Sequence, residues 1–466
     1  MAEETKEIQE LEERDLAEEV LTLLKEKRFS ALREMIAMLP SADIGVLFSE
    51  IPTEYHRLFY RLLPKEYAAE IFVEMDYDAQ ESLISSFSDG ELQEILNELF
   101  LDDTADIIEE MPAGVVARIL KNSSPEARRD LNMLLRYPRD SAGSIMTTEF
   151  VALKKNMTVD QAFRIIRQVA IDKETIYTCY ITDENRRLIG VISAKTLLIS
   201  PLDAVLGDIM DDRVIFVQTH TDREEAARKF NKYDFLALPV VDNEERLVGI
   251  ITVDDAIDVI QEEQEEDFSI MAAITPAETS YVKSSVWSLW SARIPWLLIL
   301  TLTATFTGMI ITGFENALKV CVALTAFIPM LMGTGGNAGS QASTTIVRGL
   351  SLGEIETADI WHVLWKELRV SLLCAVSLAA VTFGKVMLID RLLLNNPDVT
   401  LSVAAVVAAT LALTVVCAKL LGCSLPLLAK KIGLDPAVMA NPFITTVVDT
   451  VSLLLYFLIA KSLLGI

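Results

Sequence analysis

The chain has 466 residues and a formal net charge of −26, and this charge is divided very unevenly along it. Residues 1–280 carry 58 acidic and 29 basic side chains, whereas residues 281–466 carry 9 acidic and 12 basic side chains. A strongly acidic part followed by a nearly neutral, apolar part argues against nucleic acid as a partner, because phosphate groups would be repelled. The same excess of negative charge favours a cation as the partner.

The cysteines and the first residues indicate the compartment. The 5 cysteines show no C-x-x-C spacing, and most of them lie in apolar segments, so we expect no disulfide framework. The chain opens with a polar, acidic stretch in place of a secretory signal peptide. We therefore expect residues 1–280 on the cytoplasmic side of a cell membrane.

Residues 1–135 are predicted to form an acidic, all-α domain of superhelical type. Short amphipathic segments are punctuated by prolines, which start helices more readily than they continue them. Examples are residues 42–51, 66–75, 91–100 and 102–111. An acidic cluster in the last of these is predicted to be a solvated face, with a cation-facing surface as the alternative. Its members are Asp102, Asp103, Asp106, Glu109 and Glu110.

Residues 136–260 contain an internal duplication. Ile145-Met146 recurs as Ile209-Met210, and the run 188–192 recurs as the run 247–251. Each half predicts a helix, two β-rich runs joined by a turn, and a further helix, so the pair forms one α+β unit. These residues resemble a tandem pair of CBS domains.

The resemblance to CBS domains implies an adenine nucleotide such as ATP as a ligand. Gly249, Thr252 and Asp255 match the G-x-x-[ST]-x-x-D ribose and phosphate signature of that fold. The first half has Thr196 in place of the acidic residue, so its ribose partner is missing. A purely structural role for both halves is the alternative.

An acidic helix is predicted directly after the duplication. Residues 254–267 contain eight carboxylates, and like charges one turn apart destabilise a helix unless they are neutralised. One interpretation is a solvated acidic helix. The other is a sensor of Mg²⁺ or Ca²⁺, which prefer several carboxylate oxygens. The three histidines are too scattered to form a zinc or copper site.

Residues 293–466 predict a membrane domain of five helices. Tyr281, Lys283, Trp287 and Trp290 lie just before it, within a connecting segment over residues 261–292, and aromatic and basic residues there are typical membrane anchors. The predicted spans are residues 294–314, 320–347, 370–389, 399–418 and 442–460.

The second predicted span is interrupted by residues that are poor helix formers. They are Pro329, Gly333, Gly335, Gly336, Asn337 and Gly339. In a membrane, unwound backbone persists only where protein buries it or where it lines a watery cavity. The sequence therefore allows two interpretations, a permeation path for a small ion and close packing of small residues between helices.

Asp449 lies in the middle of the last predicted span. A carboxylate at that depth costs roughly 2.5 to 3.5 kcal/mol on insertion scales, so it is a functional candidate, with a structural hydrogen bond as the alternative. Asn441 and Asp435 place further oxygen atoms near the cytoplasmic end of the last predicted span, where they would line the inner mouth of a cation path. Mg²⁺ sheds water reluctantly, so oxygens of Gly335, Gly336 and Asn337 are expected to contact its water shell. Because five helices seldom enclose a pore alone, we expect a homodimer.

The order of these parts, together with the run 329–339, Asp435-Pro436, Asn441-Pro442 and Asp449, resembles the MgtE family of bacterial magnesium channels. The resemblance implies a dimeric Mg²⁺-selective channel for magnesium uptake, closed when intracellular Mg²⁺ binds the acidic cytosolic domains. It also implies a plug helix over residues 258–283. Asp449 would be the pore ligand, with Asn441 beside it and Asp435 at the cytosolic mouth.

The resemblance further implies a set of acidic sensor positions. These are Asp222, Glu224, Asp234, Asp255, Asp258, Glu263, Glu266 and Asp267. Two alternatives to a channel remain, a secondary transporter of Mg²⁺ or Co²⁺ and a membrane-anchored, nucleotide-sensing CBS protein without transport. The sequence contains no P-loop, nucleophile elbow or H-E-x-x-H motif, so we do not expect an enzyme.

Overall fold

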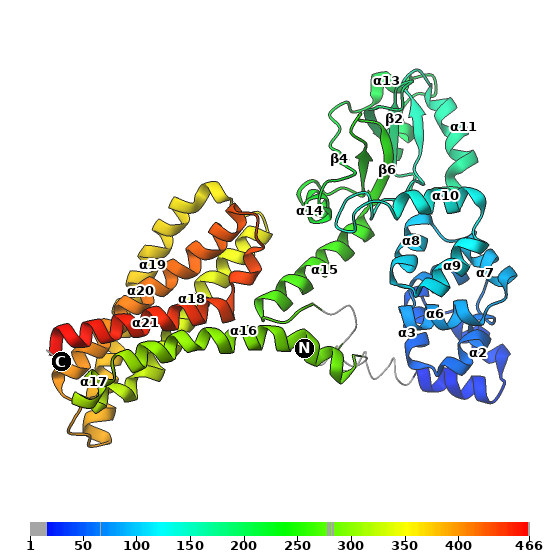
Figure 1. The fold of residues 1–466 in the computed structure, drawn as a ribbon. Coiled ribbons are helices and arrows are strands. Elements are labelled where there is room, and N and C mark those ends of the chain that lie inside the picture. Colours follow the sequence, from blue (N-terminus) through cyan, green and yellow to red (C-terminus); the bar gives the residue numbers. More distant parts are fainter. Residues whose placement is uncertain (1–15, 66, 277–280, 282–283, 465–466) are drawn as a thin grey trace. The chain divides into compact units, whose positions relative to one another are not determined.

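The computed structural model describes residues 16–65, 67–276, 281 and 284–464 (Figure 1). The chain divides into two compact units, Met1–Ile260 and Gln261–Ile466. Each unit has a hydrophobic core of its own.

Short helices that stack in succession open the first unit (Figure 1). A helix over residues 16–25 is followed by α2 (Phe29–Ile36), α3 (Ser41–Glu50), α4 (Thr53–Tyr60), α5 (Ala68–Val73), α6 (Tyr77–Ser86), α7 (Asp89–Leu96), α8 (Leu101–Glu110), α9 (Ala113–Asn122) and α10 (Pro125–Leu134). Pro40, Pro52 and Pro112 precede α3, α4 and α9, where proline's missing N–H group costs nothing. The predicted all-α domain of stacked helices is confirmed.

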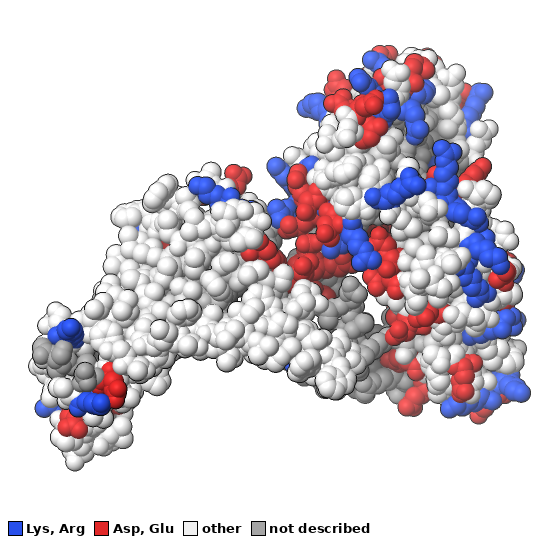
Figure 2. Space-filling model, viewed as in Figure 1, with Lys and Arg blue, Asp and Glu red and all other residues white. Residues whose placement is uncertain are grey.

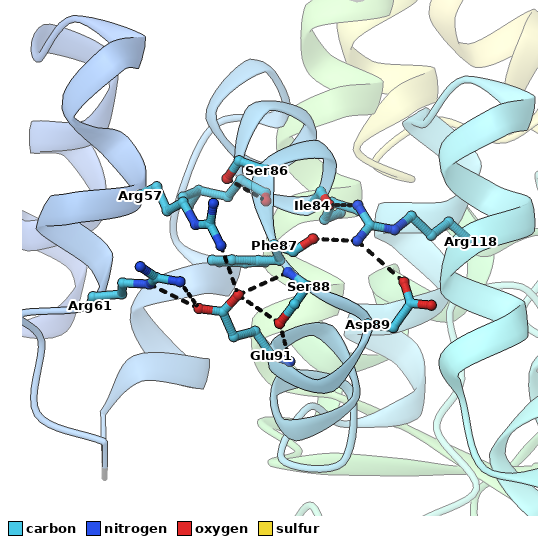
Figure 3. Close-up of polar contacts among 10 residues, drawn as sticks. Arg57, Arg61, Ile84, Ser86, Phe87, Ser88, Asp89, Glu91 and Arg118 are labelled. Atoms are coloured by element: carbon cyan, nitrogen blue, oxygen red, sulfur yellow. Dashed lines mark hydrogen bonds and ion pairs between the residues drawn. The ribbon is translucent and has the colours of Figure 1, made fainter.

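Polar contacts join neighbouring helices of this stack (Figure 3). The Glu91 carboxylate on α7 accepts hydrogen bonds from Arg57 at 3.2 Å and from Arg61 at 2.9 Å, and it also completes a capping box with Ser88. Hydrogen bonds to the Ser88 backbone and to Arg61 lower the pKa of Glu91 to about 2, so this carboxylate stays charged. Arg118 on α9 donates to the carbonyl oxygens of Ile84 and Phe87. These contacts fix the spacing of the helices around the buried core.

The internal duplication folds as two three-stranded sheets with matching topology. The strands are β1 (Ala152–Lys154), β2 (Thr178–Thr182) and β3 (Leu188–Ser193), then β4 (Val217–Gln218), β5 (Ala237–Val241) and β6 (Leu247–Thr252). In each sheet the first strand is parallel to the second, and the second is antiparallel to the third. Gly190 pairs with Ile181 and Gly249 pairs with Val240, so the two halves share one register. The predicted tandem repeat is confirmed.

The helices of the duplication are α11 (Val159–Val169), η1 (Ala170–Asp172), α12 (Ala194–Ile199), α13 (Leu206–Ile209) and α14 (Arg223–Tyr233). Residues of the helical stack, such as Leu131 and Leu134, share one core with Leu238 and Ile251 of the second sheet. The predicted boundary between residues 135 and 136 therefore divides parts that share a core, and it stays a prediction.

The acidic helix α15 (Val253–Met271) follows β6 directly. It ends where Ala273 adopts a left-handed conformation, with φ of 55°, and where the Ile274 N–H group bonds to the Ser269 carbonyl. The predicted plug helix over residues 258–283 is thus wrong in its bounds, because this turn stops the helix before Pro276. Lys283 lies outside the described residues.

The second unit is a helical bundle. Its elements are α16 (Val286–Gly313), α17 (Glu315–Val320), η2 (Val322–Phe327), α18 (Ile328–Ser351), η3 (Thr357–Asp359), α19 (Ile360–Lys385), the π-helical η4 (Val386–Leu393), α20 (Leu401–Lys431), η5 (Pro436–Met439) and α21 (Asn441–Leu464). Within the described residues four segments are long and apolar enough to cross a membrane: Val286–Gly313, Thr357–Leu393, Leu401–Lys431 and Pro436–Leu464. The second predicted span corresponds to α18, whose Ser, Thr, Asn and Gln side chains make it less apolar.

The core of the bundle lies between α18, α20 and α21, where Val407, Leu411, Val448 and Phe457 are buried. A buried ion pair between Lys419 on α20 and Glu367 on α19 joins two of the long helices, with Nζ and Oε1 3.0 Å apart. By contrast, α16 has no buried residue.

Candidate functional site

Three carboxylates from different parts of the first unit converge in one place. Asp102 lies in the first turn of α8, whereas Glu149 precedes β1 and Glu174 precedes β2. One oxygen atom from each lies within 4.8 Å of the others, and this is the one group of three such ligands among the described residues. We call these three residues the carboxylate cluster.

Hydrogen bonds hold the carboxylate cluster in place, but two of its carboxylate oxygen atoms have no hydrogen-bond partner among the described residues. Glu149 Oε2 accepts from the Leu101 N–H group at 3.0 Å, and the Glu174 N–H group bonds to the Glu149 carbonyl at 2.9 Å. Asp102 Oδ1 and Glu174 Oε2 are buried, and neither has a hydrogen-bond partner in the described part of the chain. Unpaired buried carboxylate oxygens are costly, so the donor set fits a hard divalent cation such as Mg²⁺.

The cluster raises the pKa values of its members and of the acids beside it. Burial and the nearby Asp255 charge raise the pKa of Asp102 well above its usual value. The same two causes raise the pKa of Asp103 to about 7, and burial together with Asp103 raises that of Glu174 to about 8. Like charges in a buried place oppose ionisation, and a bound cation would reverse that.

Asp255 is one of the acids whose charge raises the pKa values of Asp102 and Asp103, and it is also part of the nucleotide-binding sequence motif. Its Oδ2 accepts hydrogen bonds from the Thr252 hydroxyl and backbone N–H groups, and burial raises its pKa to about 6. Gly249 allows close approach of the segment that precedes β1, since a Cβ on Gly249 would lie 2.8 Å from the Thr147 carbonyl oxygen. The neighbouring carboxylates would repel phosphate groups, so the surroundings of Gly249, Thr252 and Asp255 favour a cation.

The prediction of a solvated acidic face over residues 102–110 is wrong for Asp102, which is 6% exposed. Asp106 and Glu110 are exposed, as predicted. Glu149 and Glu174 were not among the site residues predicted from the sequence. A comparison of the two halves of the duplication offers a signal for Glu149, because the second half has Arg213 at that place.

The other predicted sensor residues do not join this cluster. Asp222 caps α14, Glu224 pairs with Arg228 on the same helix, and Asp234 ends that helix in a left-handed conformation. On α15, Asp258 and Glu266 are exposed, Glu263 is half-buried, and Asp267 accepts a hydrogen bond from the Ser351 hydroxyl at the end of α18. Their roles as cation ligands stay predictions.

Asp449 lies on α21 among apolar residues of the bundle. Its neighbours Val448 and Ser452 are buried, and its own Oδ1 is buried without a hydrogen-bond partner among the described residues. Buried Thr410 and Thr414 on α20 likewise have hydroxyl groups without a partner. An unpaired carboxylate oxygen in an apolar helix fits a cation ligand better than a structural hydrogen bond.

The glycine-rich run is not unwound. Residues 328–351 form one continuous α-helix, so the expectation of irregular backbone at Gly335, Gly336 and Asn337 is wrong. The glycines serve close packing instead. A Cβ on Gly335 would lie 2.7 Å from Thr414, one on Gly336 would lie 2.9 Å from Thr445, and one on Gly422 would lie 2.2 Å from the Gly339 carbonyl oxygen.

The remaining predicted path residues are placed as follows. Asn337 is exposed on α18. Asp435 is exposed and caps η5 through a 2.8 Å bond from the Ala437 N–H group. Asn441 begins α21. Their contact with an ion stays a prediction.

Three kinds of comparison place the chain among known proteins. A family model described as a divalent cation transporter matches residues 328–459, an MgtE intracellular N-domain model matches residues 39–140, and a CBS-domain model matches residues 142–202 and 206–262. The magnesium transporter MgtE of Thermus thermophilus is 38% identical, over 97% of this chain and 99% of that protein. MgtE of Bacillus subtilis is 31% identical, over 95% and 96%. The crystal structure of the cytosolic domain of the Mg²⁺ channel MgtE in complex with ATP is 40% identical and covers 52% of this chain and 99% of that one, with a TM-score of 0.49.

Proposed function

Because the chain belongs to the MgtE family of divalent cation transporters, we propose that it is a Mg²⁺-selective channel that takes up magnesium and is closed by intracellular Mg²⁺. The unpaired buried oxygen of Asp449 carries this proposal. A membrane carboxylate whose oxygen no protein group satisfies is a ligand for a passing cation. Its single negative charge per chain suits an ion that keeps most of its water.

The assembly is a homodimer in the plasma membrane, with residues 1–260 in the cytoplasm. One chain supplies one Asp449, so a two-fold axis supplies a pair. The apolar surface of α16, which has no buried residue, supports this assignment, because lipid or a second copy has to cover it. Asn441 and Asp435 complete the path on the cytosolic side.

Regulation rests on the carboxylate cluster and on α15. In the absence of Mg²⁺, burial and neighbouring carboxylates raise the pKa values of Asp102, Glu174 and Asp255 and so oppose their ionisation. A cation held by Asp102, Glu149 and Glu174 would supply the missing positive charge. The acids along α15, which Figure 2 shows as a dense red band, extend this response. ATP binding at Gly249, Thr252 and Asp255 is not part of the proposal, because the same carboxylates oppose it.

The experiment is ion flux into proteoliposomes. We expect Mg²⁺ uptake by the wild-type protein and no uptake by Asp449→Asn, which keeps the shape of the side chain but removes its charge. Asp398→Asn is the matched control, because Asp398 is exposed in the turn before α20. Normal uptake by Asp449→Asn would contradict the proposal.

The same liposomes separate the rival functions. Single-channel currents distinguish a channel from a secondary transporter, and parallel flux of Co²⁺ and Mn²⁺ measures selectivity. A wild-type protein that inserts correctly but carries no divalent cation would favour a membrane-anchored sensor.

A further inference from the structure

A cavity of about 870 Å³ lies in the first unit, and none of the residues assigned above is among those that line it. Three arginines line it, two from α10 and the residues directly after it, and one from the duplication. Arg129 lies on α10, Arg136 follows that helix, and Arg186 lies in the turn between β2 and β3. Lys and Arg side chains gather around α10 in Figure 2. This concentration of positive charge is unusual in a chain with a net charge of −26.

None of the three guanidinium groups has an ion pair or hydrogen bond within the described residues, although Asp130 also lines the cavity. Nearby arginines behave differently. Arg128 donates to the carbonyl oxygens of Lys121 and Ser123, and Arg139 pairs with Glu109 at 3.4 Å. The three arginines are exposed, so their unpaired guanidinium groups at one cavity can complement phosphate oxygens, which arginine binds in a bidentate manner.

Hydrogen bonds fix the turn that carries Arg186. The Asp183 carboxylate accepts hydrogen bonds from the N–H groups of Asn185 and Arg187, and the Arg186 carbonyl accepts one from Leu247 at 3.0 Å. Arg186 itself has φ of 65°, a left-handed conformation that costs a residue with a Cβ roughly 1 kcal/mol or more. A fixed turn reduces the entropy lost when a ligand binds.

The rest of the lining sets the size and kind of ligand. Phe150, Met133 and Val248 form an apolar wall, and Phe150 is held by edge contact with Tyr180 at a centroid distance of 6.1 Å. The volume lies within the range of small-molecule sites and is large enough for a mononucleotide. Thr148 and Phe150 line this cavity, whereas the intervening Glu149 joins the carboxylate cluster, so neighbouring residues of one segment serve the two sites.

We propose that this arginine-lined cavity binds a phosphate-bearing anion of up to mononucleotide size, through Arg129, Arg136 and Arg186. The site is distinct from the Gly249-x-x-Thr252-x-x-Asp255 motif, and it does not depend on transport. Phosphate groups supply the affinity, and the apolar wall accepts a base or another flat group.

The test is calorimetric titration of the full-length protein in micelles, freed of divalent cations with EDTA. The ligands are pyrophosphate, ATP and adenosine. We expect pyrophosphate and ATP to bind, with an affinity that falls as salt is added, and adenosine to bind far more weakly. Arg129→Ala, Arg136→Ala and Arg186→Ala should each raise the Kd by about tenfold, since each removes a charged hydrogen-bond donor. Arg186→Lys should recover part of the loss.

Arg164→Ala is the matched control, because Arg164 is an exposed arginine on α11 that pairs with Asp160 at 2.6 Å. Asp255→Asn tests the sequence motif in parallel. The proposal is overturned if wild type binds neither pyrophosphate nor ATP, if the three arginine variants bind as wild type does, or if only Asp255→Asn weakens binding. Unchanged thermal unfolding of the variants excludes misfolding as the cause of any loss.

Discussion

Asp102 and Asp449 each have a buried oxygen without a hydrogen-bond partner, yet their surroundings differ. Asp102 has other carboxylates nearby, so its environment opposes ionisation through both burial and repulsion. Among the described residues, Asp449 belongs to no group of three side chains that could hold a metal ion together. Apolar residues and hydroxyl groups surround it. The first environment fits an ion that stays bound, and the second fits an ion that passes, because several carboxylates bind Mg²⁺ more tightly than one does.

The raised pKa values at the cluster predict a pH dependence of stability. Asp103 and Glu174, with pKa values of about 7 and about 8, bind more protons in the folded than in the unfolded protein near neutral pH. The free energy of unfolding in EDTA should therefore fall as the pH rises from about 4 to about 8. Mg²⁺ at a hundredfold excess over its Kd should restore about 2.7 kcal/mol at the upper end.

Thermal unfolding of the full-length protein, followed by circular dichroism, measures this slope. Glu174→Gln should flatten it and weaken the stabilisation by Mg²⁺. Glu184→Gln, an exposed acid in the turn between β2 and β3, should leave both unchanged. An identical slope in wild type and Glu174→Gln would exclude the carboxylate cluster as its origin.

At the scale of elements, α18 packs closely against its neighbours because glycines occupy the contact positions, where a side chain would not fit. Gly335, Gly336 and Gly339 bring it against α20 and α21, and Gly422 lets the backbones of α18 and α20 meet. Glycine lowers helix propensity, but a membrane bundle recovers this cost through close packing. The helix is thus a rigid wall beside Asp449.

This packing predicts different outcomes for two glycine substitutions. Gly422→Ala would place a Cβ 2.2 Å from the Gly339 carbonyl oxygen, so the helices would have to separate, at a cost of about 1–3 kcal/mol. Gly384→Ala on α19 meets nothing within 4 Å and should be neutral or slightly stabilising, since alanine favours helix. The thermal unfolding midpoint in micelles compares the two. Equal midpoints would show that the close approach of α18 and α20 is not needed.

Element types were predictable because their signals are local. The prolines before the N-terminal helices, the repeated β runs and the long apolar stretches each specify a structure through nearby residues. The continuity of α18 was not predictable, because the partners of its glycines lie on α20 and α21. The carboxylate cluster was missed for a related reason: Asp102, Glu149 and Glu174 are far apart in sequence, and only the fold brings them together. For Asp449, an acid in an apolar run is a local signal, so the sequence alone could single it out as a candidate, and its role as a cation ligand stays a prediction.

At the scale of the whole molecule, the proposed function assigns sensing to the acidic first unit and conduction to the apolar second unit. The helix α15 starts beside Asp255 and continues into the second unit, where Asp267 bonds to Ser351 on α18. One helix therefore contains both Asp255, which we propose as part of the regulatory group, and Asp267, which contacts the bundle. This continuity is one basis for proposing closure by intracellular Mg²⁺.

Neutralising part of α15 should abolish that closure. In the triple variant Asp255→Asn, Asp258→Asn and Glu263→Gln, Mg²⁺ has fewer carboxylates to bridge, so current should persist at millimolar internal Mg²⁺ that silences the wild type. Patch recordings from inside-out membranes measure this current. A control variant, Glu34→Gln, Asp43→Asn and Glu50→Gln, removes three exposed charges from α2 and α3 and should close normally. Unchanged inhibition of the α15 variant would refute the regulatory role.

The continuous hydrogen-bonded backbone of α18 has a consequence for how selectivity can change. A filter made of main-chain carbonyl groups is the same whatever the side chains are, so single substitutions alter it only indirectly. In α18 the carbonyl groups within the helix are already used by the helix itself. Under the proposed function, discrimination between divalent ions falls to side chains such as Asp449, each of which is specified by one codon. Ion preference would then be open to stepwise evolution and to engineering by point mutation.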